Sequence, residues 1–307
     1  MNKLLSLLCA VPMLCAPFLV AAQSSPIDEA AYQAALKQMQ EAPVQRVTVD
    51  DIEIAYKTFG QGEPLFAVTG NGDTMDLWSP LFIQGLAQDH KVYVFDNRGA
   101  GLTTSGTKPF TIAQFASDTA GFIQAMGYQK TKLLGFSMGS RIAAQLTIDQ
   151  PELVEKVVLY GCAPGGKAEI PRSAAVQKIF ADASGTPQQK MQRMFSVLIP
   201  KDFRDAHPDP AAYFPPATET ISAEVRAKQN KAVATWGGVY EQLPQIKVPT
   251  LIMAGTEDEV IPPANALLLA EQIPASWLVR LRGGGHGMMF QFPDRMAGVV
   301  NVFLAKP

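Results

Sequence analysis

The chain has 307 residues, of which 47% are hydrophobic and 18% are charged, a globular balance that excludes disordered and fibrous proteins. It contains 26 lysines and arginines against 28 aspartates and glutamates, which gives a net charge of −2. Because no basic surplus is available to contact phosphates, the composition argues against nucleic-acid binding.

The first 22 residues have the pattern of a secretory signal peptide. Lys3 precedes a mostly apolar run from Leu4 to Ala22, which two prolines interrupt and which ends in small or modest side chains before Gln23. An uncleaved membrane anchor is the alternative, since about 19 apolar residues could nearly span a bilayer. The prolines and the small-residue ending favour cleavage, so we expect an exported, periplasmic or extracellular protein without stable membrane insertion. Cys162 is then the remaining cysteine, and it can form no internal disulfide.

Beyond a lead-in over residues 23–44, strand and helix patterns alternate along the chain. In chain order we expect a helix over 30–40, strands over 46–49, 53–59, 65–69 and 91–95, a helix over 111–126, a strand over 132–134, a helix over 138–149, strands over 154–160, 250–254 and 277–281, and a final helix over 294–304. This alternation predicts an α/β domain over residues 45–307, with a mostly parallel twisted sheet flanked by helices.

One long segment breaks the alternation. Residues 165 to about 236 carry helical pieces and several prolines but no clear strand pattern. We interpret this segment as a helical cap over the carboxyl edge of the sheet, where open α/β sheets bind ligands. Aromatic residues of the cap and of the entrance suggest an apolar pocket for a modest acyl or alkyl group: Phe180, Phe195, Tyr213, Phe214, Trp236, Trp78 and Phe290.

The segment Gly135-Phe136-Ser137-Met138-Gly139 fits the pattern G-x-S-x-G. It follows one expected strand and opens the helix over 138–149, which is the strand–turn–helix context of a nucleophile elbow. A serine at this turn projects above the sheet, and the Met138 amide at the helix N-terminus can stabilise an oxyanion. A glycine-lined turn with an idle serine is the alternative, but the context favours Ser137 as a nucleophile.

Only three histidines are available as a base for Ser137. His90 precedes the strand over 91–95, at the amino end of the sheet. His207 lies in a proline-rich part of the cap, where we expect it to be solvated. His286 lies in a glycine-rich loop directly after the strand over 277–281, at the carboxyl edge, and is predicted as the base by elimination and position.

Asp258 is predicted as the carboxylate that orients the imidazole, because it follows the strand over 250–254 and also falls at the carboxyl edge. Its neighbours Glu257 and Glu259 are expected to face solvent while the loop turns Asp258 inward. Glu169 is a weaker alternative, because the chain should already have entered the cap at that point.

These motifs resemble those of the α/β-hydrolase superfamily over nearly all of residues 45–307. The order Ser137, Asp258, His286 is the order found in that superfamily. Residues 96–103 resemble its D-x-R-G-x-G-x-S turn, with Thr103 in place of the serine.

The chain departs from the superfamily after its third expected strand, where His-Gly is usual and Thr69-Gly70-Asn71 stands instead. Because the glycine is kept, the resemblance implies that the Asn71 amide is the second oxyanion donor. The missing histidine leaves the support of this loop open. The Asn71 side chain either adds a hydrogen bond there or caps the turn.

Residues and resemblance together predict a serine hydrolase that cleaves a carboxylic ester, lactone or thioester through an acyl-enzyme on Ser137. The alternatives are a cofactor-free perhydrolase or haloperoxidase-like activity, a peptidase activity on the same triad, and a catalytically silent binding protein. Neither metal-ligand spacing nor a phosphate-binding glycine motif occurs, so we expect no metal and no cofactor. The expected partner is a small acyl substrate, and the sequence indicates neither its chain length nor an oligomeric state.

Overall fold

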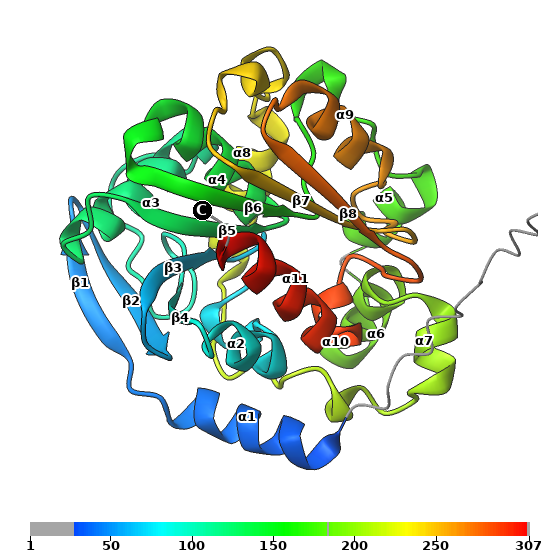
Figure 1. The fold of residues 1–307 in the computed structure, drawn as a ribbon. Coiled ribbons are helices and arrows are strands. Elements are labelled where there is room, and N and C mark those ends of the chain that lie inside the picture. Colours follow the sequence, from blue (N-terminus) through cyan, green and yellow to red (C-terminus); the bar gives the residue numbers. More distant parts are fainter. Residues whose placement is uncertain (1–27, 183, 306–307) are drawn as a thin grey trace, which may run out of the picture.

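A computed structural model of the chain describes residues 28–182 and 184–305, so the predicted leader over residues 1–22 lies outside the described residues. Within them, eight strands form a sheet in the order β1-β2-β4-β3-β5-β6-β7-β8 (Figure 1). The strands are β1 (Gln45–Val49), β2 (Ile52–Phe59), β3 (Glu63–Val68), β4 (His90–Phe95), β5 (Thr131–Phe136), β6 (Val154–Tyr160), β7 (Thr250–Gly255) and β8 (Ser276–Leu281). The pairs β1–β2 and β2–β4 are antiparallel and the other five pairs are parallel, so the expected mostly parallel sheet is confirmed.

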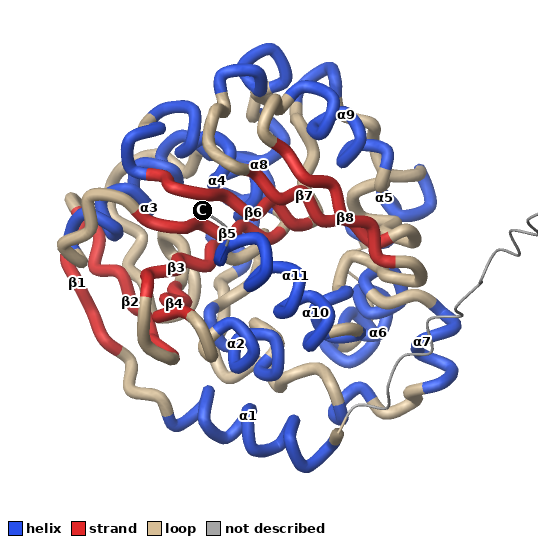
Figure 2. Tube along the Cα trace, viewed as in Figure 1, coloured by secondary structure: helices blue, strands red, loops and turns tan. Residues whose placement is uncertain are grey.

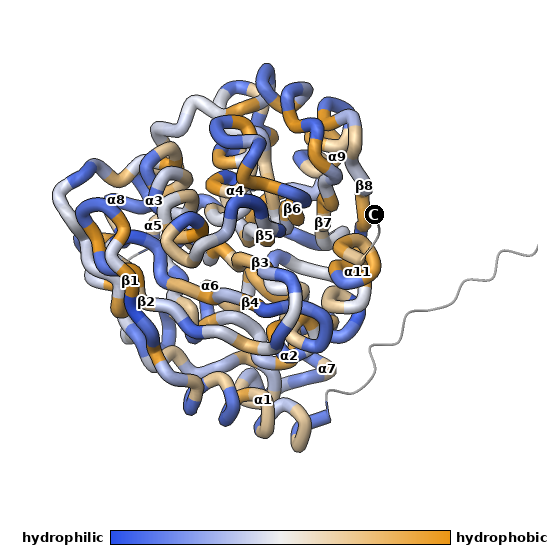
Figure 3. Tube along the Cα trace, turned by 60° about the vertical axis from the view of Figure 1, so that its left-hand side comes forward, coloured by the Kyte–Doolittle hydropathy of each residue, from blue (hydrophilic) through white to orange (hydrophobic). Residues whose placement is uncertain are grey.

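Helices cover both faces of this sheet (Figure 2). Those packed around it are α1 (Glu29–Glu41), α2 (Pro80–Leu86), α3 (Ile112–Ala125), α4 (Met138–Asp149), α9 (Ala264–Gln272), α10 (Met288–Gln291) and α11 (Pro293–Ala305). The hydrophobic core is divided by the sheet: α3, α4 and α9 contribute to one cluster, and α1, α2 and α11 to the other. The outer helices accordingly alternate hydrophobic and hydrophilic segments along their length (Figure 3).

The inner strands belong to both clusters at once. Along β3, Phe66 and Val68 pack in the cluster with α3 and α4, while Leu65 and Ala67 pack in the cluster with α2 and α11. Successive side chains of a strand point to opposite faces, so a strand covered on both sides must be apolar throughout. This explains why these strands read as short continuous apolar runs in the sequence.

The short helices α9 and α10 were not expected, and α2 was expected only as a helix of unstated bounds before His90. Each has nine residues or fewer, which is too few for a helical period to stand out. Helix α2 begins at local signals instead, with Pro80 in its first turn and the Ser79 hydroxyl accepting a hydrogen bond from Phe82 N.

Between β6 and β7 the described residues form helices and no strand, in agreement with the expected cap segment. Its α-helices are α5 (Ala174–Ala181), α6 (Pro187–Leu198), α7 (Lys201–Ala206) and α8 (Ala223–Thr235). A carboxylate of the sheet edge anchors the cap loop before α8: Asp76 Oδ2 accepts hydrogen bonds from Glu219 N at 2.8 Å and from the backbone and hydroxyl of Thr218. The cap is thereby held over the carboxyl ends of the strands.

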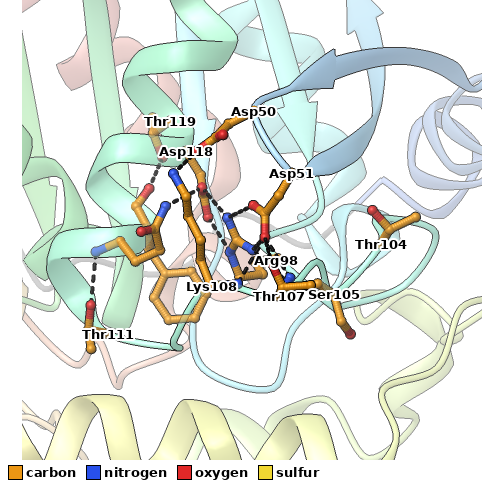
Figure 4. Close-up of polar contacts among 12 residues, drawn as sticks. Asp50, Asp51, Arg98, Thr104, Ser105, Thr107, Lys108, Thr111, Asp118 and Thr119 are labelled. Atoms are coloured by element: carbon orange, nitrogen blue, oxygen red, sulfur yellow. Dashed lines mark hydrogen bonds and ion pairs between the residues drawn. The ribbon is translucent and has the colours of Figure 1, made fainter.

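The turn after β4 is organised by a buried arginine (Figure 4). The Arg98 guanidinium is fully buried and donates to both oxygens of Asp118, at 2.8 and 2.6 Å, and to Asp51 at 2.8 Å. Asp96 of the same turn accepts from Met75 N at 2.7 Å. Charges buried this deeply need such partners, so the motif over residues 96–103 joins the turn to α3 and to the β1–β2 turn.

No helix among residues 28–182 and 184–305 has both the length and the hydropathy needed to cross a bilayer.

Candidate active site

Ser137 occupies the sharp turn between β5 and α4. Its backbone has φ 55° and ψ −115°, a conformation that residues other than glycine rarely adopt. A Cβ at Gly135 would overlap the Gly139 carbonyl, and one at Gly139 would overlap the Val68 carbonyl, so strand and helix can meet only with glycine at both positions. The turn is fixed by a 2.9 Å hydrogen bond from Ser137 N to Tyr160 O. The spacing of G-x-S-x-G therefore has a steric cause.

Asn71 and Met138 line the same cavity as Ser137, and their backbone amides have no acceptor among the described residues. The loop that carries Asn71 is held by the cap helix α8: Gly72 N donates to Gln229 Oε1 at 2.9 Å, and Asn71 Nδ2 donates to Asn230 Oδ1 at 2.6 Å. The Asn71 side chain thus adds a hydrogen bond, as one of the two expectations had it, and its partner belongs to the cap. These contacts supply the loop support that the absent histidine left open.

His286 and Asp258 form a buried pair. His286 Nδ1 lies 2.8 Å from Asp258 Oδ2, and their side chains are 3% and 1% exposed. The second carboxylate oxygen, Oδ1, accepts hydrogen bonds from Val260 N at 2.9 Å and Ile261 N at 2.8 Å. With Nδ1 donating to the carboxylate, Nε2 is left as the acceptor that a general base requires.

The loop that carries His286 is braced by its neighbours. The Tyr160 hydroxyl donates to the His286 carbonyl, and Gly285 N donates to Gln291 Oε1 at 2.8 Å. Ser137 and His286 line the same cavity, but no hydrogen bond joins their side chains within the described residues. Catalytic contacts of this kind often close only when substrate is bound.

The residues considered as alternatives to Asp258 and His286 are exposed, lie away from the carboxyl edge of the sheet or contact other side chains. Glu257 and Glu259 are exposed, whereas Asp258 is buried. His90 is buried at the start of β4, far along the sheet from its carboxyl edge, and burial lowers its pKa. His207 was expected to be solvated but is half-buried, with its ring stacked 4.1 Å from that of Phe203.

A cavity of about 920 Å³ opens above Ser137 and His286 between the sheet and the cap. Four of the seven aromatic residues expected in the pocket line it: Phe180, Phe214, Trp236 and Phe290. The other three, Trp78, Phe195 and Tyr213, are instead buried in the hydrophobic core. The spacing of these aromatic residues along the chain does not distinguish a residue that lines the cavity from one that packs in the core behind it.

Asp73, which was not among the residues predicted from the sequence, lines the cavity two residues after Asn71. Desolvation raises the pKa of this carboxyl to about 6, against the opposing attraction of His286 and Arg226. A carboxylate beside the oxyanion donors would oppose negative charge developing there, so its neutral form suits the site better. The feature of the sequence that could have indicated Asp73 is its position directly after the Gly70-Asn71-Gly72 turn, at the carboxyl end of β3.

Comparison with known proteins places these features in a family. A family model described as alpha/beta hydrolase fold matches residues 63–293. The chain is 26% identical over 252 residues to "Putative carbamate hydrolase RutD" of Azorhizobium caulinodans, covering 80% of this chain and 92% of that protein. It is 28% identical over 248 residues to "Poly(3-hydroxyalkanoate) depolymerase" of Ectopseudomonas oleovorans, covering 78% and 84%.

Solved structures show the same relationship. An alpha/beta hydrolase fold protein from Chitinophaga pinensis superposes with a TM-score of 0.73 and 25% identity, covering 88% of this chain and 99% of that one.

Proposed function

The chain belongs to the α/β-hydrolase family, and we propose that it is a serine hydrolase that cleaves carboxylic esters, lactones or thioesters through an acyl-enzyme on Ser137. One observation carries the proposal. His286, joined at 2.8 Å to the buried Asp258, lines the same cavity as a serine held in a strained turn. Strain of this kind persists where the surrounding structure imposes it, and it collects at reactive sites.

In the proposed reaction the Ser137 hydroxyl attacks the acyl carbon while His286 Nε2 takes its proton. Asp258 stabilises the imidazolium, and the amides of Asn71 and Met138 donate to the oxyanion, a contribution of about 3 kcal/mol per donor in comparable sites. Collapse of the tetrahedral intermediate breaks the bond to the leaving alcohol or thiol, which receives the proton from His286. Water activated by His286 then attacks the acyl-enzyme and releases the acid.

The cavity and the relatives support an acyl substrate of small or moderate size. A cavity of about 920 Å³ that is lined by five phenylalanine and tryptophan side chains suits an apolar acyl or alkyl group. One relative is named as a depolymerase of a polyester and another as a carbamate hydrolase, and both names describe cleavage at an acyl carbon. We further propose, from residues 1–22 alone, that the protein acts outside the cytoplasm.

Replacing the nucleophile tests this function. Ser137→Ala should lower hydrolysis of 4-nitrophenyl esters by about 10³-fold or more and abolish labelling by a fluorophosphonate probe. Ser196→Ala, in the cap and outside the cavity, is the matched control and should keep both. Ester turnover by folded Ser137→Ala within about tenfold of the unsubstituted protein would remove the serine from the mechanism.

A further inference from the structure

The cap end of the active-site cavity carries more positive than negative charge. Arg141, Lys167 and Arg172 line this end, and Glu169 is the carboxylate among them. This end of the cavity therefore has more cationic than anionic side chains, although most of the other residues that line the cavity are apolar or carry amides. How each charge is compensated therefore indicates what the cavity is built to receive.

Arg141 is fully compensated by Glu169. Its Nη1 and Nη2 donate to Oε2 and Oε1 at 2.8 and 3.0 Å, a two-pronged contact that occupies both carboxylate oxygens. The Arg141 side chain is 6% exposed, and its guanidinium lies over the Trp236 ring at 5.5 Å. Glu169 is therefore already engaged and leaves its second neighbour, Arg172, without a counterion.

Arg172 has no carboxylate partner within residues 28–182 and 184–305, and its guanidinium instead lies 4.3 Å from the centre of the Phe180 ring. The side chain is half-buried. Desolvation first, and then repulsion from Arg141, lower the pKa of this guanidinium, although Glu169 and Asp258 attract it from a distance. When one face of a guanidinium stacks on an aromatic ring, the N–H groups at its edge remain free to bind a ligand.

The backbone around Arg172 is held in place. Asn265, fully buried on α9, accepts from Ile170 N at 2.8 Å and donates to Ile170 O at 2.9 Å. Gln177 Nε2 donates to the Arg172 carbonyl at 3.0 Å. Because the loop is fixed before any ligand arrives, binding through this guanidinium has a reduced entropic cost.

We propose that Arg172 binds a free carboxylate of the substrate, so that the preferred substrate is a monoanionic ester or lactone with its carboxylate remote from the scissile bond. The inference rests on the proposed hydrolytic function of Ser137 and adds the substrate class to it. A guanidinium matches a carboxylate through two parallel N–H···O bonds, which a neutral group cannot reproduce. Phe180 is 41% exposed, so this contact lies toward solvent and should weaken as salt is raised.

The test compares substrates that differ only in charge. Mono(4-nitrophenyl) esters of adipic, pimelic and suberic acid vary the distance between the carboxylate and the ester, and the corresponding terminal amides are neutral isosteres. For the best chain length we expect kcat/KM for the acid to exceed that for the amide by about tenfold or more, mainly through KM.

Arg172→Gln should bring this ratio of acid to amide close to one, and Arg172→Lys should restore part of it. Lys178→Gln is the matched control, since it removes an exposed cation from α5, the helix that follows Arg172, outside the cavity, and should keep the ratio.

A direct measurement of binding distinguishes a failure of the proposed carboxylate site from a failure of the proposed hydrolase function. In Ser137→Ala, calorimetry should show tighter binding of the acid than of the amide, and Arg172→Gln in that background should remove the difference. Turnover of acid and amide at equal rates would overturn the carboxylate site while leaving the hydrolase intact. If neither the acid nor the amide were turned over, the proposed hydrolase function would be overturned. If the acid and the amide then also bound equally to Ser137→Ala, the carboxylate site would be overturned as well.

Discussion

Asp258→Asn exchanges a single oxygen of the buried pair for an amide nitrogen, and the structure specifies how the new side chain must lie. Asp258 Oδ1 accepts from Val260 N and Ile261 N, at 2.9 and 2.8 Å, so the asparagine oxygen has to stay on that side. The amide nitrogen then faces His286 Nδ1, where Oδ2 lay at 2.8 Å. Both groups cannot donate to each other, so the imidazole proton moves to Nε2. An imidazole protonated at Nε2 cannot accept the proton of Ser137.

The expected loss in kcat is about 10⁴-fold, equivalent to about 5 kcal/mol of transition-state stabilisation. Stability should change by less than about 1 kcal/mol in the free energy of unfolding, because the two backbone hydrogen bonds are kept and the volume is unchanged. The variant therefore separates the orientation of the base from the integrity of the fold.

The assay measures kcat for one 4-nitrophenyl ester at a single pH, with urea unfolding as the fold control. Glu257→Gln and Glu259→Gln flank the same loop and remove exposed charges, so each should stay within about tenfold of the unsubstituted protein. If Asp258→Asn kept its activity while one of the two glutamine variants lost it, the carboxylate would be misassigned by one residue.

Three further predictions concern other parts of the chain. Asp118→Asn leaves the fully buried Arg98 with one fewer carboxylate and should cost about 3 kcal/mol in urea unfolding; a loss below about 1 kcal/mol would mean that the pair is not important for stability. Glu219 is half-buried beside Asp96, and desolvation first, then Asp96, raise its pKa from 4.5 to about 9. The folded state then keeps a proton that the unfolded chain loses, so the contribution of this group to stability is full below about pH 4.5 and falls as pH rises toward 9. Glu219→Gln should be increasingly stable relative to the unsubstituted protein at higher pH, and a constant difference between pH 5 and 9 would contradict this. Mass spectrometry of the exported protein should find a mature chain starting near Gln23, whereas an intact Met1 on a membrane-bound species would support an anchor.

Local sequence patterns were sufficient to locate the strands and the long helices. The bounds of α4 and β6 agree with the expectation to the residue, and the other expected elements shift by three residues or fewer at either end. The reason is that a strand buried on both faces must be continuously apolar, and a helix that covers the sheet must repeat its apolar residues every three to four positions.

The residues proposed for catalysis were also identifiable from the sequence, because each follows a parallel strand at its carboxyl end and all such ends lie along one edge of a sheet. Ser137, Asp258 and His286 could therefore be grouped without a structure. The exposure of Glu257 and Glu259 around a buried Asp258 follows from the same position in the loop.

Contacts between the cap and the sheet edge could be found only in the tertiary structure. The bonds from α8 to the Asn71 loop and the contact of Glu219 with Asp96 join segments separated by long stretches of chain. The pairing of Arg141 with Glu169, which leaves Arg172 without a carboxylate partner among the described residues, joins distant segments as well. No periodicity or motif encodes such pairs, because they depend on how the helices of the cap settle on the sheet. The sequence by itself thus determined the fold class and the residues proposed for catalysis, and the packing of the cap decided the shape and the charge of the cavity around them.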